Sequence, residues 1–226
     1  MTVVTDQLDF DKDGAVLHAG AALSILSALE AELADVPPDL AGARLYNRAG
    51  LSALLDVTGP IGSLTAQMLG SDAHAIRAIL FDKTAATNWA LGWHQDRTIA
   101  VKERVDVAGY GPWSIKAGVH HVEPPFAVIE QMVTLRIHLD PVPADNAPLL
   151  IAPGSHRFGR VPESEVPALV VRCGTHACLA DRGDVWVYRT PILHASAAAT
   201  SVTGRRVLQV DYSAEQLAHG LRWAGV

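Results

Sequence analysis

The spacing of hydrophobic residues divides the chain into a helical beginning and a strand-rich remainder. Residues 20–34 carry leucine and isoleucine at intervals of three and four in a composition that favours helix, and Pro37-Pro38 ends the run. Residues 49–56 and 60–69 show the same pattern between glycine and proline residues. The pattern therefore predicts three helices before any strand.

From residue 74 onward, short runs rich in β-branched and aromatic residues are separated by Gly, Pro, Asn and Asp. Many short strands after a helical block favour an antiparallel sandwich or barrel of the jelly-roll kind. The fold class we expect is mainly β with N-terminal helices. The runs are HAIRAILF, RTIAVKERV, VIEQMVTLRIHL, PLLIAP, THACLA, DVWVY and RRVLQVDY.

The whole chain, residues 1–226, is long enough for one domain, and no repeat or linker divides it. We expect a helical N-terminal part over 1–72 packed on a jelly-roll core over 73–213, followed by a tail over 214–226. Residues 105–126 contain GYGPW and EPP and predict a long irregular stretch. Such a stretch is more typical of a functional lid that determines specificity than of a simple connection.

Composition narrows the classes of partner. The net charge is −6, and the lysines and arginines are scattered, so the chain offers no electrostatic surface for nucleic acid or an anionic membrane. Cys173 and Cys178 are too few for a disulfide framework, the N-terminus lacks signal-peptide features, and no apolar run could span a bilayer. We expect a cytoplasmic protein that acts on a small molecule.

The stretch WHQD, residues 93–96, suggests a metal site. Alternate residues of a strand point to the same face, so His94 and Asp96 could bind one ion while the residue between them points away. Two imidazoles and one carboxylate are the ligands of non-haem Fe(II) oxygenases, and His194, after the strand-like DVWVYRTPI, is the best candidate for the third. Arg205 follows eleven residues later and could hold a dicarboxylate cosubstrate in a two-pronged contact.

Four segments together resemble the phytanoyl-CoA dioxygenase family over roughly residues 74–213: FDKTAATNWALGWHQD, LRIHLDPVPADNAPLLIAPGSH, GDVWVYRTPILHAS and RRVLQVDY. The resemblance implies a double-stranded β-helix (jelly roll, cupin-like) and hydroxylation that uses Fe(II), 2-oxoglutarate and O2 and releases succinate and CO2. His94, Asp96 and His194 resemble the iron ligands of the family. Arg205 resembles its 2-oxoglutarate anchor.

Other positions follow from the same resemblance. Ser196 and Gln95 resemble residues that hydrogen-bond the cosubstrate, and Lys83 is a further candidate for contact with the cosubstrate or the substrate. The usual Asn-Gly turn before PGSH reads Asn146-Ala147 here, which we expect to change turn flexibility rather than chemistry. Halogenating relatives replace the carboxylate ligand with a small residue, so Asp96 favours hydroxylation.

Two groups have simpler interpretations beside the functional one. His138 and Asp140 repeat the His-x-Asp pattern, but Asp before Pro is typical of a turn. The group formed by Cys173, His176 and Cys178 could belong to a zinc site, although free cysteines in a strand-like run more often pack in a core.

We expect three residues to contact the substrate. Trp113 and His121 lie on or beside the expected lid, and Arg136 shares a strand face with His138. Strand alternation allows only one of Arg205 and Arg206 to point inward, and the family spacing selects the first. The alternative function is a cupin-like metal-binding protein, an isomerase or a sensor, that keeps the metal ligands but does not use 2-oxoglutarate.

Overall fold

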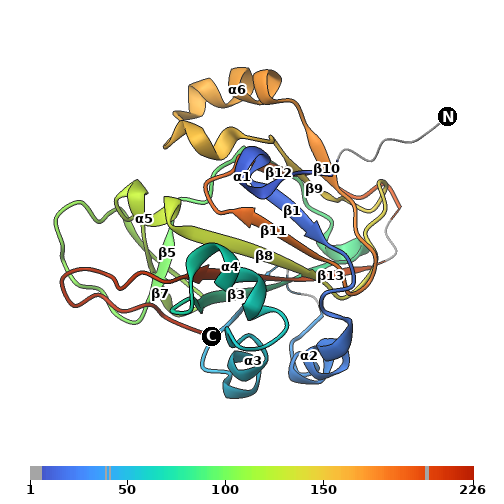
Figure 1. Cartoon of the computed structure of the whole chain (residues 1–226), viewed down its shortest axis with the longest axis horizontal. Helices are drawn as coiled ribbons and strands as arrows, with labels where there is room; N and C mark the ends of the chain where they lie inside the picture. Colours follow the sequence, from blue (N-terminus) through green and yellow to red (C-terminus); the bar gives the residue numbers. More distant parts are fainter. Residues whose placement is uncertain (1–6, 39, 41, 202–203) are drawn as a thin grey trace.

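A computed structural model describes residues 7–38, 40, 42–201 and 204–226. Residues 1–6 lie outside the described residues. They belong to the N-terminal part that we expected to be helical and to the N-terminus that lacks signal-peptide features. Within these residues, the large sheet has six antiparallel strands (Figure 1). In spatial order they are β1 (Ala15–His18), β11 (Val185–Arg189), β8 (Met132–His138), β13 (Arg205–Ser213), β3 (His74–Lys83) and β2 (Ala43–Leu45).

Two smaller antiparallel sheets complete the β structure. One comprises β10 (His176–Cys178), β9 (Leu149–Ile151), β12 (His194–Ser196) and β4 (Leu91–His94), in that order. The other comprises β5 (Ile99–Val101), β7 (Val119–Val122) and β6 (Trp113–Lys116). The expectation of a mainly β protein with antiparallel sheets is confirmed.

The large sheet has one apolar face, and the N-terminal helices cover it (Figure 1). Alternate residues of each strand point to this face, as the two-residue period of a strand requires. On β8 and β13 they are Val133, Leu135, Ile137, Leu208 and Val210, all buried. They pack against leucines of α2 (Leu26–Glu32), α3 (Ala49–Leu54) and α4 (Gly62–Leu69).

The opposite face of the same two strands is polar although it is buried. This face carries Thr134, Arg136 and His138 on β8 and Arg205, Gln209 and Asp211 on β13. A buried polar group is unfavourable unless it finds a partner, so this many polar groups on one buried face indicate a site for a polar ligand. The cavity described below lies on this face.

The three predicted helices are present, with shorter bounds. The run 20–34 contains the 3₁₀ turn η1 (Leu23–Ile25) and then α2. The runs 49–56 and 60–69 become α3 and α4. The N-terminal part is nevertheless not wholly helical, because β1 and β2 lie within it and form the two edges of the large sheet.

Several elements differ from the sequence-based expectation. The run VIEQMVTLRIHL begins in a helix, and of RTIAVKERV only β5 is a strand. The stretch 105–126 is only partly irregular, because it contains the hairpin of β6 and β7. The remaining unpredicted elements are α1 (Phe10–Asp13), η2 (Ala85–Thr87), α5 (Phe126–Glu130), η3 (Ser155–Phe158), η4 (Glu163–Glu165) and α6 (Val166–Cys173).

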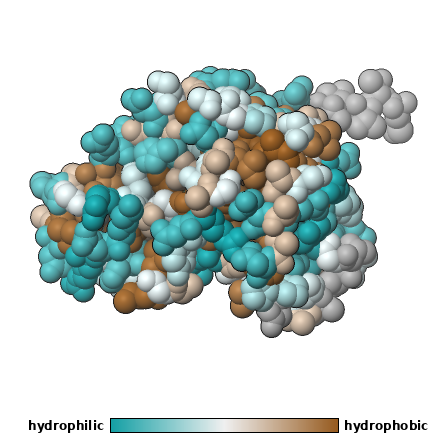
Figure 2. Space-filling model, turned by 90° about the horizontal axis from the view of Figure 1, so that it is seen from below, coloured by the Kyte–Doolittle hydropathy of each residue, from teal (hydrophilic) through white to brown (hydrophobic). Residues whose placement is uncertain are grey.

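The outer surface is mixed in character. Seen from below the view of Figure 1, the molecule carries mostly hydrophilic residues with separate hydrophobic areas (Figure 2). In the part of the chain that the structure describes, every helix is too short or too polar to cross a membrane.

Candidate active site

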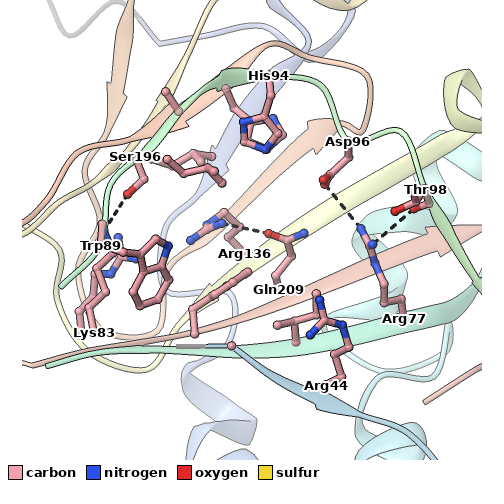
Figure 3. Close-up of a pocket in the computed structure, with 18 of the residues that line it drawn as sticks. Arg44, Arg77, Lys83, Trp89, His94, Asp96, Thr98, Arg136, Ser196 and Gln209 are labelled. Carbon is pink, nitrogen blue, oxygen red and sulfur yellow. Dashed lines mark hydrogen bonds and ion pairs between the residues drawn. The ribbon is translucent and has the colours of Figure 1, made fainter. Parts of the chain in front are cut away.

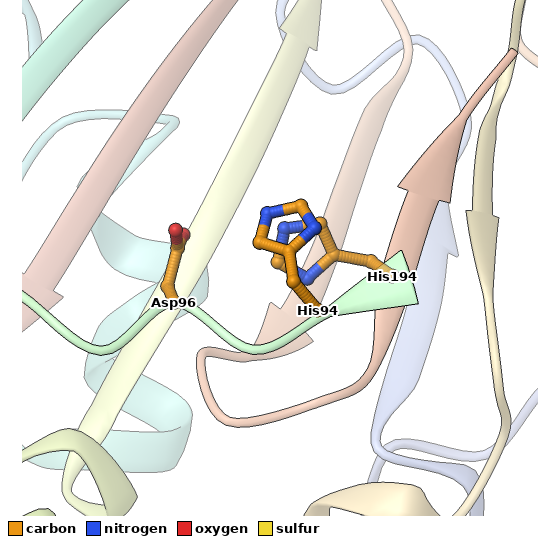
Figure 4. A group of neighbouring side chains, drawn as sticks. All are labelled: His94, Asp96 and His194. Atoms are coloured by element: carbon orange, nitrogen blue, oxygen red, sulfur yellow. The ribbon is translucent and has the colours of Figure 1, made fainter. Parts of the chain in front are cut away.

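Strand pairing brings the two predicted histidine ligands together. β12 pairs with β4 so that His194 lies directly opposite His94, and their ring centroids are 4.3 Å apart. Asp96 follows two residues after the end of β4 and turns its carboxylate toward the imidazoles (Figure 4). One ligand atom from each of the three side chains lies within 4.8 Å of the others. These residues therefore form a compact group with the donor set of a non-haem iron site.

Both imidazoles are oriented by the backbone two residues before them. Nδ1 of His94 lies 2.8 Å from the carbonyl of Gly92, and Nδ1 of His194 lies 3.0 Å from that of Ile192. A carbonyl only accepts, so each Nδ1 carries the proton and Nε2 keeps its lone pair for a metal. Burial also lowers the pKa of His194 to about 4, which keeps this imidazole neutral and able to bind a cation.

Asp96 is held ionised by a partly buried arginine. Burial alone would raise the pKa of this carboxyl, but Arg77 and the two nearby histidines lower it below its ordinary value. Nη2 of Arg77 lies 3.5 Å from Asp96, while its Nε donates to Asp211 at 2.5 Å. Asp211 in turn accepts from Thr134 at 3.0 Å. This chain of contacts orients the carboxylate ligand from behind.

The second His-x-Asp pair has different surroundings. Neither ring nitrogen of His138 has a hydrogen-bond partner in the described structure, and burial with Arg136 and Arg205 nearby lowers its pKa to about 3. Asp140 accepts from the backbone N–H, Nε and Nη2 of Arg206 at 2.8, 2.9 and 2.8 Å. This aspartate therefore fixes the start of β13.

The Cys-His-Cys group is also divided between different elements. Cys173 ends α6, whereas His176 and Cys178 lie on β10. His176 meets Trp186 edge-on at 5.6 Å, and Cys178 is buried in an apolar cluster that raises the pKa of its thiol. Over the described ranges, the metal-binding group comprises none of these three residues.

A cavity of about 430 Å³ opens beside the His-Asp-His group (Figure 3). Its wall includes residues of β2, β3, β8 and β13 in the large sheet and of β4 and β12 in the four-stranded sheet. The lining includes six basic side chains and one acidic side chain, Asp96. The basic ones are Arg44, Arg77, Lys83, Lys116, Arg136 and Arg205.

Three of the residues expected to contact the cosubstrate line one end of this cavity. Arg205 is 2% exposed; one of its Nη atoms donates to the carbonyl of Ala147, and burial with Arg136 nearby lowers its pKa to about 9. Lys83 lies opposite Arg205 in the strand register. Its ammonium donates to the carbonyls of Trp89 and Ala197 at 2.7 and 2.8 Å and to Oγ of Ser196 at 3.1 Å.

The turn at Asn146-Ala147 bears on this end of the cavity. Ala147 adopts a positive φ of 51°, the conformation in which the family pattern has glycine, and its carbonyl accepts the hydrogen bond from Arg205. The departure from Asn-Gly therefore lies against the predicted cosubstrate anchor, but the contact uses a backbone carbonyl that glycine would also supply.

Gln95 does not line this cavity and has a structural role. Its amide donates to the carbonyls of Gly159 and Pro191 at 2.9 and 2.8 Å and accepts from the N–H of Val161 at 2.9 Å. All these partners are backbone groups behind the metal-binding strand. The prediction that Gln95 hydrogen-bonds the cosubstrate is not supported by this placement, because its amide is already fully engaged.

Two of the three substrate candidates lie outside the cavity lining. Trp113 packs against an apolar cluster and lies 5.5 Å from the guanidinium of Arg104. His121 is 1% exposed and directs Nδ1 to the carbonyl of Val119. Arg136 does line the cavity, where its Nη1 donates to Gln209 at 3.0 Å. The hairpin expected to act as a lid reaches the cavity through Lys116 instead.

The sequence analysis missed Arg44, Arg77, Lys116 and Gln209 among the lining residues. A signal for Arg77 was available, because it alternates with Ile79, Phe81 and Lys83 along one strand and so shares their face. Gln209 likewise alternates with Arg205. Arg44 lies on a three-residue strand far upstream of the site and gives no such signal.

The fold of this chain is shared with known proteins. Over 94% of this chain and 79% of the other, it matches EctD from S. alaskensis with a TM-score of 0.62 at 16% identity. It also matches HygX from Streptomyces hygroscopicus, solved with nickel, 2-oxoglutarate and hygromycin B, over 90% of this chain and 84% of the other (TM-score 0.60, 13% identity). A third match is SnoN, a non-haem 2-oxoglutarate-dependent epimerase from nogalamycin biosynthesis, over 90% and 77% of the two chains (TM-score 0.61, 14% identity).

The predicted double-stranded β-helix is thereby confirmed, since these neighbours share the fold of iron- and 2-oxoglutarate-dependent oxygenases. EctD was also solved with bound Fe, and separately with 2-oxoglutarate and 5-hydroxyectoine. No curated protein matches the sequence. The family described as phytanoyl-CoA dioxygenase (PhyH) matches residues 55–207, about two thirds of the chain. The chain belongs to the phytanoyl-CoA dioxygenase family.

Proposed function

We propose that the protein is an Fe(II)- and 2-oxoglutarate-dependent dioxygenase that hydroxylates a small organic molecule. The observation that carries the proposal is the convergence of His94, Asp96 and His194 beside a cavity whose far end holds a buried arginine. Iron and 2-oxoglutarate are both present in crystal structures of proteins with this fold, which supports the assignment.

The three side chains fit Fe(II) chemically. Two neutral imidazoles and one carboxylate would occupy three positions on one side of the ion and leave the rest for other ligands. With 2-oxoglutarate and O2, iron bound there supplies oxidative decarboxylation of the keto acid to succinate and CO2 and oxidation of a substrate C–H bond to an alcohol. Arg77 keeps Asp96 ionised, and the carbonyls of Gly92 and Ile192 hold the imidazoles in the ligand tautomer.

Arg205 is the proposed anchor for the distal carboxylate of 2-oxoglutarate. At neutral pH it is a cation, since its pKa of about 9 remains above 7. Its Nε is buried and has no hydrogen-bond partner among the described residues, which leaves a donor for an incoming carboxylate. Ser196 lines the same end and could donate its hydroxyl to the cosubstrate while it accepts from Lys83.

Lys83 has a supporting role in this scheme. Its three ammonium protons match the three oxygen atoms that it contacts, so the side chain ties β3 to the segments around Trp89 and Ala197. Its positive charge still favours an anion nearby. Burial, together with Arg205 and Arg136, lowers the pKa of Lys83 to about 8, so a dianion beside these groups would relieve their mutual repulsion.

The carboxylate at Asp96 supports hydroxylation rather than halogenation, because a ligand at this position leaves no room for a halide. Arg136 lies between the two ends of the cavity and is the proposed contact to the substrate from the floor (Figure 3). We further propose a cytoplasmic enzyme without a nucleic-acid partner, on the composition and on the two free cysteines.

The decisive experiment measures 2-oxoglutarate turnover with Fe(II) while small candidate acids, amines and thioesters are supplied. We expect at least one compound to stimulate succinate release and to gain one oxygen atom by mass spectrometry. Asp96→Ala should lower succinate release at least about 100-fold, since it removes a ligand of the metal. A product of unchanged mass would contradict hydroxylation and indicate epimerisation.

Two matched pairs of variants separate the roles of the two arginines, Arg205 and Arg206, and of the two aspartates, Asp96 and Asp140. Arg205→Gln should raise the Kd of 2-oxoglutarate about 100-fold, or about 3 kcal/mol, while Arg206→Gln should leave it within about threefold. Asp140→Ala should lower the free energy of unfolding but preserve turnover in the folded protein. If Arg205→Gln keeps full turnover while His94→Ala abolishes it, the protein uses its metal without 2-oxoglutarate, as a cupin-like isomerase or sensor would.

A further inference from the structure

The cavity carries more positive charge than the proposed cofactors require. Six basic side chains line it, but only one carboxylate does. Asp211, behind the lining, is already paired with Arg77. The two positive charges of Fe(II) and the two negative charges of 2-oxoglutarate cancel each other. A basic excess therefore remains in the cavity after both are bound, and a buried excess of one sign is unfavourable without a counter-charge.

Among the six, only Arg77 has an acidic partner in the described part of the chain, and of the other five Arg44 and Lys116 lie near Arg77. Arg44 projects from the edge strand β2 into the cavity near Arg77 (Figure 3). Its Nε is buried without a hydrogen-bond partner among the residues described. Lys116 reaches the same end from the β6–β7 hairpin, and within the described structure no ion pair engages it.

Arg44 and Arg205 enter the cavity at different points along β3, so a 2-oxoglutarate held by Arg205 lies away from Arg44. In the strand register Arg44 lies opposite Ile79 and Arg205 lies opposite Lys83, so the two arginines are offset by four residues along β3. Four residues of a strand correspond to about 13 Å. The carboxyl carbons of 2-oxoglutarate are roughly 5 Å apart at ordinary bond lengths. Arg44 and Lys116 are therefore available to a second ligand.

The two ends of the cavity differ in position relative to the metal ligands. Lys83 and Ser196 lie at one end, Arg44 and Arg77 lie at the other, and Arg136 lies between them (Figure 3). Asp96 adjoins the Arg77 end through its 3.5 Å contact. A molecule bound at Arg44 would thus lie beside the metal on the side away from Arg205.

We propose that the substrate is an organic acid whose carboxylate is held by Arg44 and Lys116 at the Asp96 end of the cavity. This inference rests on the function proposed above and names the substrate class for the same site. A guanidinium offers two parallel N–H donors that match a carboxylate, and an ammonium adds a point charge. The anchored acid would hold its carbon chain between this end and the metal.

The test measures binding rather than turnover. The protein is loaded with Zn(II), which fills the metal site without reacting with O2, and is saturated with 2-oxoglutarate so that the Arg205 end is occupied. Benzoate and pentanoate are then titrated against benzamide, pentanamide and phenyl phosphate, with affinities from ligand-observed NMR. We expect each acid to bind at least about tenfold more tightly than its amide, which corresponds to about 1.4 kcal/mol.

Matched variants locate the binding group. Arg44→Gln and Lys116→Gln should each weaken acid binding at least about tenfold and leave amide binding unchanged. Lys102→Gln removes the same charge from an exposed position that does not line the cavity, and it should change neither. Lys116 lies on a half-exposed hairpin, so its variant provides the test even if Arg44→Gln melts early.

Equal affinity for acids and amides, or wild-type acid binding in both variants, would overturn the inference. Tighter binding of phenyl phosphate than of benzoate would overturn the choice of a carboxylate. The Kd of 2-oxoglutarate, measured first in the same samples, separates this result from the proposed function. If 2-oxoglutarate fails to bind the Zn(II)-loaded wild type, the proposed function fails; if it binds normally and acids show no preference, only the substrate class fails.

Discussion

At the scale of single residues, the polar side chains around the site divide into those already engaged by the protein and those left for a ligand. Gln95 and Lys83 use all their hydrogen-bond donors on the protein itself. Arg44, Arg136 and Arg205 each retain a buried Nε without a partner in the described structure. Because an unsatisfied buried donor is unfavourable, the second set indicates where ligands bind.

Gln95→Met should destabilise the fold without weakening 2-oxoglutarate binding. The side chain is 4% exposed and satisfies three backbone groups, so its removal should lower the free energy of unfolding by about 2–4 kcal/mol. The Kd of 2-oxoglutarate in the folded, metal-loaded protein should stay within about threefold. Urea unfolding and an anaerobic titration measure the two quantities.

The exposed Gln216 provides the control, since Gln216→Met makes the same chemical change on the surface and should leave both quantities unaltered. The opposite pattern for Gln95→Met, with normal stability and an affinity reduced more than tenfold, would restore the role in cosubstrate binding that the sequence suggested.

Sequence patterns located residues in this site only where they lie on long strands or within recognisable motifs. His94 and Asp96 occur in one short motif. By strand alternation, Arg77 shares the face of Lys83, and Gln209 shares the face of Arg205. Arg44 could not be found in this way, because β2 is three residues long and its place beside β3 depends on tertiary packing. For Gln95, alternation shows that the side chain points away from the metal but not which groups it meets there.

At the scale of elements, the β6–β7 hairpin shows why the expected lid looked irregular. Its two turn residues, Ala117 and Gly118, have φ values of 50° and 78°, the conformation of a tight two-residue hairpin turn. Asn-Gly is the usual sequence signal for such a turn, and alanine gives none. The same left-handed conformation costs a non-glycine residue about 1 kcal/mol, so the hairpin that carries Lys116 is less stable than it could be.

Ala117→Asn should therefore stabilise the hairpin. Asparagine tolerates the left-handed conformation better than alanine, and the position is exposed, so no packing is lost. We expect the free energy of unfolding to rise by about 0.5–1 kcal/mol, or about 1–4 °C in Tm, by calorimetry. Ala117→Val should shift Tm in the opposite direction, because a β-branched side chain is disfavoured at positive φ. Equal effects of the two substitutions would show that the turn is not left-handed in solution.

At the scale of the whole molecule, the large sheet separates stability from chemistry. Its helix-covered face forms the main apolar core, while its other face holds the charged cavity wall. The two-residue period placed Arg136 beside a histidine on one strand face and allowed only one of Arg205 and Arg206 to point inward, but the helices that cover the other face could be placed only from the structure. Buried polar residues reduce stability, and the protein accepts this reduction where ligands bind.

Buried histidines make the stability of the protein sensitive to acid. His138, His194 and His121 are buried, and their pKa values are lowered to about 3, 4 and 4, first of all by burial. The unfolded chain binds protons near pH 6.5, where these folded histidines stay neutral. Stability contributed by the neutral histidines is thus present above pH 6.5 and is lost as pH falls from 6.5 toward 4.

His138→Leu should remove one histidine's share of this loss. At pH 5.5, one unit below the unfolded pKa, that share is about 1.4 kcal/mol. Urea unfolding of the metal-free proteins at pH 7.5 and 5.5 should show a difference smaller by this amount in the variant than in the wild type. His74→Leu is the control: His74 is exposed, so its removal should leave the difference unchanged. An identical pH dependence in His138→Leu and wild type would mean that His138 binds a proton inside the fold, where Arg136 and Arg205 oppose it.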